Sequence, residues 1–325
     1  MSVLTRLAHA ALIAAAAFAA PGAHAQQHWP DKPIRFVVPY PPGGGTDVIA
    51  RIVQERFQAT LGQPIIIENR GGAAGSLGTD VVAKAPSDGY TVLFTLSSHT
   101  INPSIYPKLP FNTVKDFEPV GTVASLPQIL VANLQLPVNN VAELIALAKA
   151  KPDSLSFASV GNGSPGHLAG ELFKLRTGVK IAHIPYRGGG PAVTDVMGGQ
   201  VPLLWVSIPA AAQFVKTGKL KALAVSTTKR SAAFPDVPTM QEAGVADFEV
   251  DSWYAMFVPA KTPKAIVEKL NAALNTIVRE PDIRDKLLAQ GSEGVGGTPD
   301  ALGRTVDHEL VKWAKLAKDA NIRAD

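Results

Sequence analysis

The 325-residue sequence contains no cysteine, which excludes disulfide bonds, cysteine nucleophiles and thiolate metal sites. Charged residues are scarce, at 18% against 46% hydrophobic, so the chain is too apolar for a disordered protein and can bury a substantial core. The formal net charge of +4 is too small and too dispersed for a dedicated nucleic-acid binder. Length and composition therefore predict a globular protein of two domains or one large one.

The first 25 residues have the pattern of a secretory signal peptide. Arg6 precedes an apolar run over 7–20, which ends at Pro21-Gly22. Ala23-His24-Ala25 then has the small-residue form that signal peptidase cuts, so we predict cleavage after Ala25 and export from the cytoplasm. A membrane anchor is the alternative, but the run of about 14 residues is shorter than the roughly 20 that span a bilayer.

The remaining 300 residues alternate short apolar runs with amphipathic segments. Strands are predicted over 34–38, 65–67 and 90–95, separated by helices, and this order implies a parallel, doubly wound sheet. The alternation of strands and helices stops in the Pro-rich segment 101–120, resumes from 128, and stops again over 234–238. Two such units linked by two Pro-rich crossings predict an α/β protein with two lobes around a cleft.

Two Gly-rich loops are candidates for ligand binding. Gly43-Gly44-Gly45-Thr46-Asp47 lies between the first strand and its helix, where backbone N–H groups and the helix dipole favour an anion. It is not a nucleotide-binding P-loop, because no Gly-Lys-Ser/Thr follows, and Asp47 is expected to cap the helix. The second loop, 161–166, matches G-x-G-x-x-G, but the next strand ends at 184–187 without the carboxylate that dinucleotide binding requires.

Ser164 has two readings that the sequence leaves open. Asn162 stands where a nucleophile elbow needs glycine, so Ser164-Pro165 suits the cap and first residue of a helix. In the other reading, the loop and the helix N-terminus together bind an anion. His167, one turn further, either packs against the helix or contacts the ligand.

No catalytic or metal-binding set stands out among the scattered histidines. Lys312 occupies the place where a zinc-protease motif beginning at His308 would need its second histidine. Ser98 and His99 follow the third strand at the edge where open α/β sheets bind ligands. The histidines that remain after cleavage at Ala25 are His28, His99, His167, His183 and His308.

A series of short motifs runs in order along nearly the whole mature chain. They lie at 39–47, 68–75, 86–90, 101–103, 109–111, 116–117, 163–169, 184–188, 198–201, 218–225 and 235–239. In these motifs the chain resembles the Bug family, the extracytoplasmic solute receptors of tripartite tricarboxylate transporters. Gly190 before Pro191 is one mild departure from the family pattern.

The resemblance implies a type II periplasmic binding protein that closes over a small carboxylate. The expected lobes are 26–124 with 250–325, and 125–249, and the mature protein is expected in the periplasm. Family members hold one carboxylate between two βα loops through N–H groups, hydroxyls and waters. The expected ligand-binding residues are Tyr40, Gly43, Gly44, Gly45, Thr46, Asp47, Ser98, Gly161, Asn162, Gly163, Ser164, His167, Tyr186 and Ser207.

The same resemblance implies a monomer with no catalytic activity and no cofactor or metal, whose partners are membrane transporter subunits. Two alternatives stay open. One is a secreted serine hydrolase that uses Ser164 or Ser98 with His167 or His99. The other is a receptor that passes its signal to the sensor kinase of a two-component system.

Overall fold

The computed structural model describes residues 29–125, 127–319 and 322–323. The predicted signal peptide and its cleavage site after Ala25 lie outside these residues. Met1–Asp31 forms a separate unit, and the fold described below is that of Lys32–Asp325. Among the residues that the structure describes, no helix combines the length and apolar character needed to cross a membrane.

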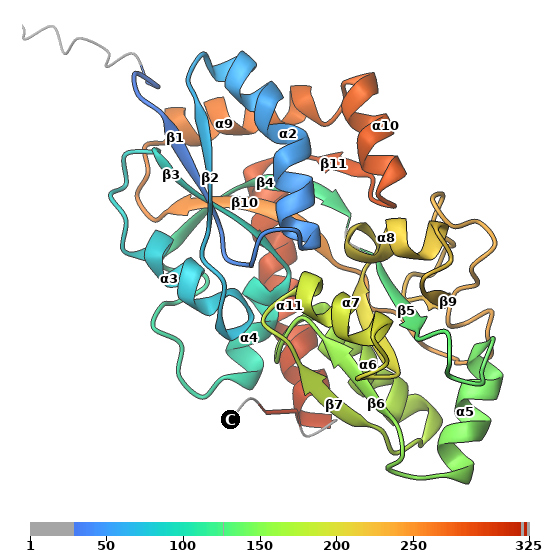
Figure 1. Cartoon of the computed structure of the whole chain (residues 1–325). Coiled ribbons are helices and arrows are strands. Elements are labelled where there is room, and N and C mark those ends of the chain that lie inside the picture. The colour runs from blue at the N-terminus through green and yellow to red at the C-terminus, as the bar shows by residue number, and fades with distance from the viewer. Residues whose placement is uncertain (1–28, 126, 320–321, 324–325) are drawn as a thin grey trace, which may run out of the picture. The chain divides into compact units, whose positions relative to one another are not determined.

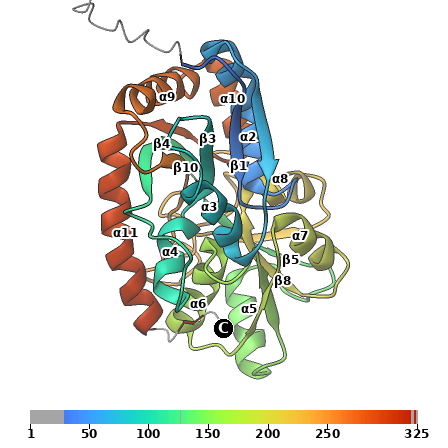
Figure 2. The same ribbon diagram turned by 90° about the vertical axis from the view of Figure 1, so that its left-hand side faces the viewer.

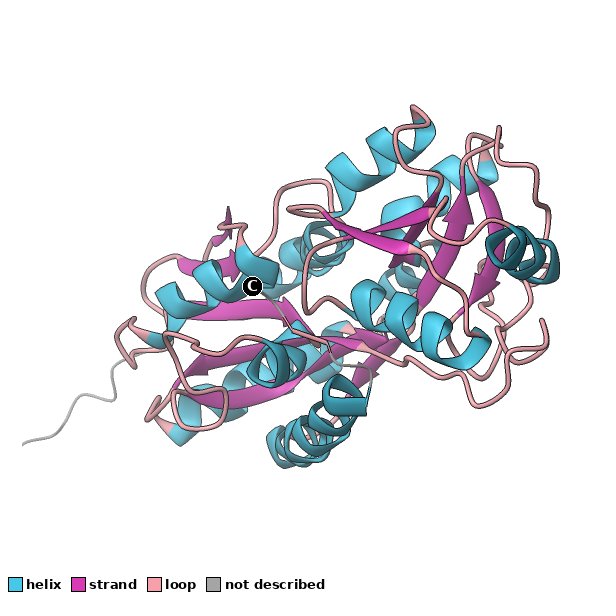
Figure 3. Cartoon of the chain, turned by 90° about the horizontal axis from the view of Figure 1, so that it is seen from below, coloured by secondary structure: helices cyan, strands magenta, loops and turns pink. Residues whose placement is uncertain are grey.

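Two β-sheets organise the chain (Figure 1). We call the six-stranded sheet and its helices the first lobe, and the five-stranded sheet and its helices the second lobe; Figure 3 shows the two groups of strands, each flanked by helices. The first sheet has the order β11-β4-β10-β3-β1-β2, with β1 Ile34–Val38, β2 Ile65–Asn69, β3 Thr91–Leu96, β4 Phe117–Ser125, β10 Trp253–Pro259 and β11 Gly294–Gly296. The second has the order β7-β6-β8-β5-β9, with β5 Gln128–Ala132, β6 Ser156–Ser159, β7 Ala182–Pro185, β8 Leu203–Ser207 and β9 Lys221–Val225.

The sheets are mixed: the parallel order predicted from the first three strands is confirmed, whereas later strands run antiparallel to their neighbours. Strand β1 pairs in parallel with β2 and β3, as the βα rhythm implied. Strand β10 enters the first sheet between β3 and β4 and runs antiparallel to both. Strand β5 is likewise antiparallel to β8 and β9. Both strands follow a crossing between the sheets, and an apolar run that is buried on both faces does not reveal its direction.

Most of the helices directly follow a strand along the chain. Ser164 Oγ accepts the N–H of His167 at 3.2 Å and Pro165 is the first residue of its helix, so the predicted capping role of Ser164 is confirmed. The helices are α2 Gly45–Leu61, α3 Ser76–Ala83, α4 Ser98–Ile105, α5 Val141–Ala150, α6 Pro165–Thr177, α7 Gly189–Met197, α8 Ile208–Lys216, α9 Lys264–Ile277, α10 Pro281–Ala289 and α11 Pro299–Asp319, with a short 3-10 turn, η1, at Ala73–Gly75.

Helix α11 contributes to the cores of both lobes. Leu302 and Val306 pack in a cluster with Phe257 of the first sheet. Further along the helix, Trp313 joins a second cluster that contains Trp205 of the second sheet. Figure 2 shows α11 extending past β4 and α4 toward α6. One helix thus packs its two halves against different sheets.

Buried Glu309 anchors the middle of α11. Its carboxylate accepts hydrogen bonds from Thr100 Oγ1 at 2.7 Å, from Trp253 Nε1 at 3.0 Å and from Trp313 Nε1 at 3.3 Å. Burial raises the pKa of Glu309, while the three donors oppose the rise. Because Thr100 lies on α4 and Trp253 on β10, this one carboxylate ties three elements together.

We expect Glu309→Gln to lower the free energy of unfolding by about 1–3 kcal/mol, because the new amide group would face donors that then lack an acceptor. Urea denaturation measures the loss. Glu268→Gln is the matched control, since Glu268 lies exposed on α9 and forms a surface ion pair with Lys264 at 3.6 Å. Equal effects of the two substitutions would contradict a structural role for Glu309.

Candidate functional site

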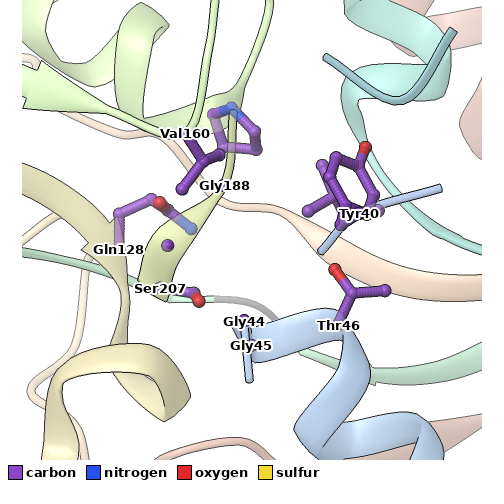
Figure 4. Close-up of a pocket in the computed structure, with 11 residues that line it drawn as sticks. Tyr40, Gly44, Gly45, Thr46, Gln128, Val160, Gly188 and Ser207 are labelled. Carbon is purple, nitrogen blue, oxygen red and sulfur yellow. The ribbon is translucent and has the colours of Figure 1, made fainter. Parts of the chain in front are cut away.

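A small cavity lies between the two lobes (Figure 4). About 20 Å³ of it is open to water, which is room for one or two water molecules. In Figure 4, Tyr40 and Thr46 stand on one side, facing Gln128, Val160 and Ser207 on the other. The lining residues are Tyr40, Gly44, Gly45, Thr46 and Leu96 from the first lobe, and Gln128, Val160, Pro165, Gly188, Gly189 and Ser207 from the second.

Four helices begin at this cavity. Gly45 starts α2, Pro165 starts α6, Gly189 starts α7, and Ser207 directly precedes α8. The first N–H groups of a helix have no partner within the helix, and the helix dipole adds partial positive charge there. No side chain caps α2, α7 or α8. Among the described residues no lysine or arginine lines the cavity, so the helix N-termini are the source of partial positive charge there.

Gly45 allows the second lobe to approach α2. A Cβ at this position would clash with Ser207 Oγ and would lie 2.6 Å from the Tyr254 hydroxyl. Tyr254 is fully buried on β10, and its hydroxyl lacks a hydrogen bond of good geometry although it faces Ser207. Glycine is therefore required at position 45 for the two hydroxyls to reach the start of the helix.

The hydroxyl groups at the cavity are neutral. Burial raises the pKa of Tyr40 to about 12 and also raises that of Tyr254. Tyr40 donates its hydroxyl to Ala74 O at 3.3 Å. Thr46 is 3% exposed and lines the cavity beside Tyr40. The site thus offers N–H and O–H donors and no fixed full charge.

Asp47 supports the first loop and does not line the cavity. Its carboxylate accepts hydrogen bonds from Gly43 N at 2.9 Å, from Arg51 Nε at 2.9 Å and from Asn69 Nδ2 at 3.1 Å. Burial opposes ionisation, but these three donors lower the pKa of Asp47, so it stays ionised. Asn69 also donates to Tyr40 O at 3.0 Å, so Asp47 and Asn69 together fix the loop.

The second predicted loop packs beside the cavity. Gly161 and Gly163 have φ angles of 125° and 80°, which glycine adopts without strain. Ser159 Oγ accepts the Gly161 N–H at 3.1 Å, and His167 Nδ1 accepts the Gly163 N–H at 3.2 Å. Side chains of β6 and α6 therefore fix the loop through these two hydrogen bonds.

Of the expected ligand-binding residues, Tyr40, Gly44, Gly45, Thr46 and Ser207 line the cavity. Six further residues line it that were not among the expected ones: Leu96, Gln128, Val160, Pro165, Gly188 and Gly189. The runs 161–166 and 188–190 were visible as helix starts, whereas nothing local marks Gln128. The expected residues that do not line the cavity are Gly43, Asp47, Ser98, Gly161, Asn162, Gly163, Ser164, His167 and Tyr186.

His167 and His183 form a stacked pair under the second loop, with ring centroids 4.0 Å apart. His183 Nε2 lies 2.7 Å from Ser159 Oγ. Burial lowers the pKa of His167 to about 4 and that of His183 to about 2. Tyr186 donates its hydroxyl to Asp195 at 2.7 Å. These side chains are occupied in packing and hydrogen bonding within the second lobe.

The serine and histidine pairs of the hydrolase alternative are not assembled. Ser164 Oγ accepts the backbone N–H of His167, whose Nδ1 is already bonded to Gly163. Ser98 Oγ and both ring nitrogens of His99 lack hydrogen-bond partners, and His99 lies among phenylalanine rings. Burial there lowers the pKa of His99 to about 3. Within the described residues, no group of three or more His, Asp or Glu could hold a metal ion.

Comparison with known proteins agrees with this architecture. The model of the family described as "Tripartite tricarboxylate transporter family receptor" matches residues 49–322. The BugT protein of Bordetella pertussis is 39% identical over 313 residues, which cover 96% of this chain and 95% of BugT.

Two solved structures resemble the chain closely. The periplasmic binding protein BugD has a TM-score of 0.88 at 36% identity, over 91% of this chain and 100% of that one. The Rpa4515 protein of R. palustris, solved with adipate, also has a TM-score of 0.88, at 37% identity, over 91% of this chain and 99% of that one. The predicted two-lobed binding-protein fold is therefore confirmed.

Gly45→Ala is expected to keep the lobes apart, because the added methyl group would occupy the space of Ser207 Oγ. Overpacking of this kind costs about 1–3 kcal/mol. Small-angle scattering should show a larger radius of gyration, and the melting temperature should fall. Gly303→Ala is the control, since the nearest atom to its new Cβ would lie 3.8 Å away. An unchanged radius in Gly45→Ala would refute the steric argument.

The histidine pair makes the fold sensitive to acid. Both pKa values lie below the ordinary value of 6.5, so the unfolded chain binds more protons and stability falls as the pH drops below about 6.5. Between pH 7 and pH 5 the loss is about 1–2 kcal/mol per buried histidine.

His183→Gln should reduce this pH dependence in denaturant titrations, because one titrating group is removed. The exposed His308 on α11 gives the control, His308→Gln, which should leave the dependence as in the wild type. The interpretation is wrong if the stability of His183→Gln falls as steeply with decreasing pH as that of the wild type.

Proposed function

The chain belongs to the family of tripartite tricarboxylate transporter receptors, and from that premise we propose that it captures a small carboxylate between its lobes and delivers it to a membrane transporter. The observation that carries the proposal is the convergence of four helix N-termini on one uncharged cavity. An anion gains from all four dipoles at once.

A carboxylate would bind at the start of α2. The N–H groups in its first turn point away from the helix, and Thr46 and Ser207 lie beside them as hydroxyl donors. Tyr254 supplies a buried hydroxyl that has no other partner of good geometry. These donors hold a negative charge without lysine or arginine, so the ligand can be released when the lobes open.

The ligand class follows from the neighbours and the cavity. Rpa4515 was solved with adipate, a dicarboxylate, and it shares 37% of its sequence with this chain. The present cavity admits only one or two waters, so a dicarboxylate requires the lobes to separate and close again. The protein is then a binding protein without catalytic activity or cofactor, monomeric, and a partner of transporter subunits.

Closure would occur between lobes made of 26–124 with 250–325, and of 125–249. Two crossings would form the hinge. The chain leaves the first sheet after Ser125 and enters the second at Gln128, and it returns between Val225 and Trp253. Binding of the ligand to both lobes would favour the closed form.

The proposed ligand class is tested by a thermal-shift screen of mono-, di- and tricarboxylates. A ligand that binds only the folded state raises the melting temperature, so at least one dicarboxylate should raise it by several degrees. Its uncharged diamide should not. If no carboxylate shifts the melting temperature, or if the diamide matches the acid, the proposal fails.

Thr46→Val should raise the dissociation constant of that carboxylate about five- to tenfold in calorimetry, because one hydrogen bond is lost while shape is kept. Thr60→Val is the matched control: Thr60 lies exposed near the other end of α2. Unchanged affinity in Thr46→Val would show that this hydroxyl does not contact the ligand.

A further inference from the structure

Contacts beside the cavity join the two lobes without any ligand. Tyr106, which follows α4 in the first lobe, donates its hydroxyl to Asn162 O of the second lobe at 3.0 Å. Burial raises the pKa of Tyr106, so the hydroxyl remains a donor. Its acceptor is a backbone carbonyl of the loop that leads into α6. The bond therefore spans the gap between lobes at the second Gly-rich loop.

Asn102 brings α4 against the same loop. Its side chain is 2% exposed, and its Nδ2 donates to Ala74 O at 3.2 Å and to Ser76 Oγ at 3.1 Å. Its Oδ1 has no partner and lies where a Cβ on Gly163 would sit. Such a Cβ would also approach Ile105 to 2.7 Å. Only glycine at position 163 lets the loop lie this close to α4.

The strained turn η1 completes the contact. Ala73 and Ala74 have φ angles of 47° and 48°, in the left-handed region that costs about 1–2 kcal/mol per residue. This conformation places Ala74 O where it accepts both Tyr40 OH and Asn102 Nδ2. Ala74 also lies next to Gly161, with 3.8 Å between its Cα and a Cβ built on the glycine.

A continuous set of contacts thus runs from Tyr40 of the first lobe, at the cavity, to the Gly-rich loop of the second lobe. Tyr40 lines the cavity and bonds to Ala74, which bonds to Asn102, which packs on Gly163. Tyr106 adds a direct hydrogen bond to Asn162. None of Ala74, Asn102 and Tyr106 lines the cavity. Their contacts hold the loop, not a ligand.

We propose that Asn102 and Tyr106 form a latch, which holds loop 161–163 against the first lobe and stabilises the closed form through protein contacts alone. The effect on ligand affinity rests on the proposed function; the effect on closure does not. The latch lies outside the cavity, so the same contacts can form when the lobes close around a bound ligand. Closure over the ligand then costs less free energy, so the latch lowers the dissociation constant. Tyr106 and Asn102 are positioning residues.

The absence of cysteine gives a direct measurement of closure. Ala59→Cys on α2 and Ala146→Cys on α5 place one spin label on an exposed site of each lobe. Pulsed electron resonance then gives the distance distribution between the lobes without ligand. Tyr106→Phe should shift this distribution toward longer distances, and Gly163→Ala should shift it further because of the clash with Asn102.

Tyr90→Phe is the matched control, because Tyr90 precedes β3, at the opposite end of that strand from the one that leads into α4 and Tyr106. It should keep the wild-type distances. In calorimetry, Tyr106→Phe should raise the dissociation constant of the tightest carboxylate about three- to tenfold, as expected for one lost hydrogen bond.

The two proposals fail in different ways. If no carboxylate binds the wild type, the proposed function is overturned, and a shifted distance in ligand-free Tyr106→Phe still supports the latch. If Tyr106→Phe and Gly163→Ala both keep the wild-type distances, the latch is overturned, whatever binds. Circular dichroism of each variant confirms that a shift does not come from unfolding.

Discussion

The meeting of four helix N-termini at one cavity, three of them without a side-chain cap, is the constraint around which this protein is built. Backbone donors that face a closed cavity need an acceptor, and side chains leave three of the four helices uncapped there. The glycines at 44, 45, 188 and 189 keep this surface free of side chains, so that backbone reaches the cavity. An anion bound there would accept hydrogen bonds from several of these donors at once.

The same close approach links binding to closure. Because Gly45 has no Cβ, Ser207 and Tyr254 can lie against the start of α2. Because Gly163 has no Cβ, Asn102 can lie against the second loop. Each glycine sits where one lobe touches the other, so both contacts are lost when the lobes separate. Helix α11 packs against the cores of both lobes and is tied to α4 and β10 by Glu309. In the proposed closure, three features would act together: the candidate ligand site, the neighbouring loop contact and the helix that connects the two cores.

Much of this arrangement was predictable from local patterns. The first loop, the cap at Ser164 and the two-lobed fold follow from spacing, glycine and proline. The direction of β10 did not, because a strand buried on both faces has no period that indicates direction. Gln128 and Tyr254 reach the site through tertiary packing, which no neighbouring residue signals. His167 was open between two roles, and stacking on His183, distant in sequence, placed it under the loop.

The most direct test of the account is a crystal structure of the protein with adipate. We expect one carboxylate between the lobes, with an oxygen within hydrogen-bond distance of a backbone N–H in the first turn of α2 and of Ser207 Oγ. A carboxylate held by lysine or arginine side chains away from these helix starts would contradict it.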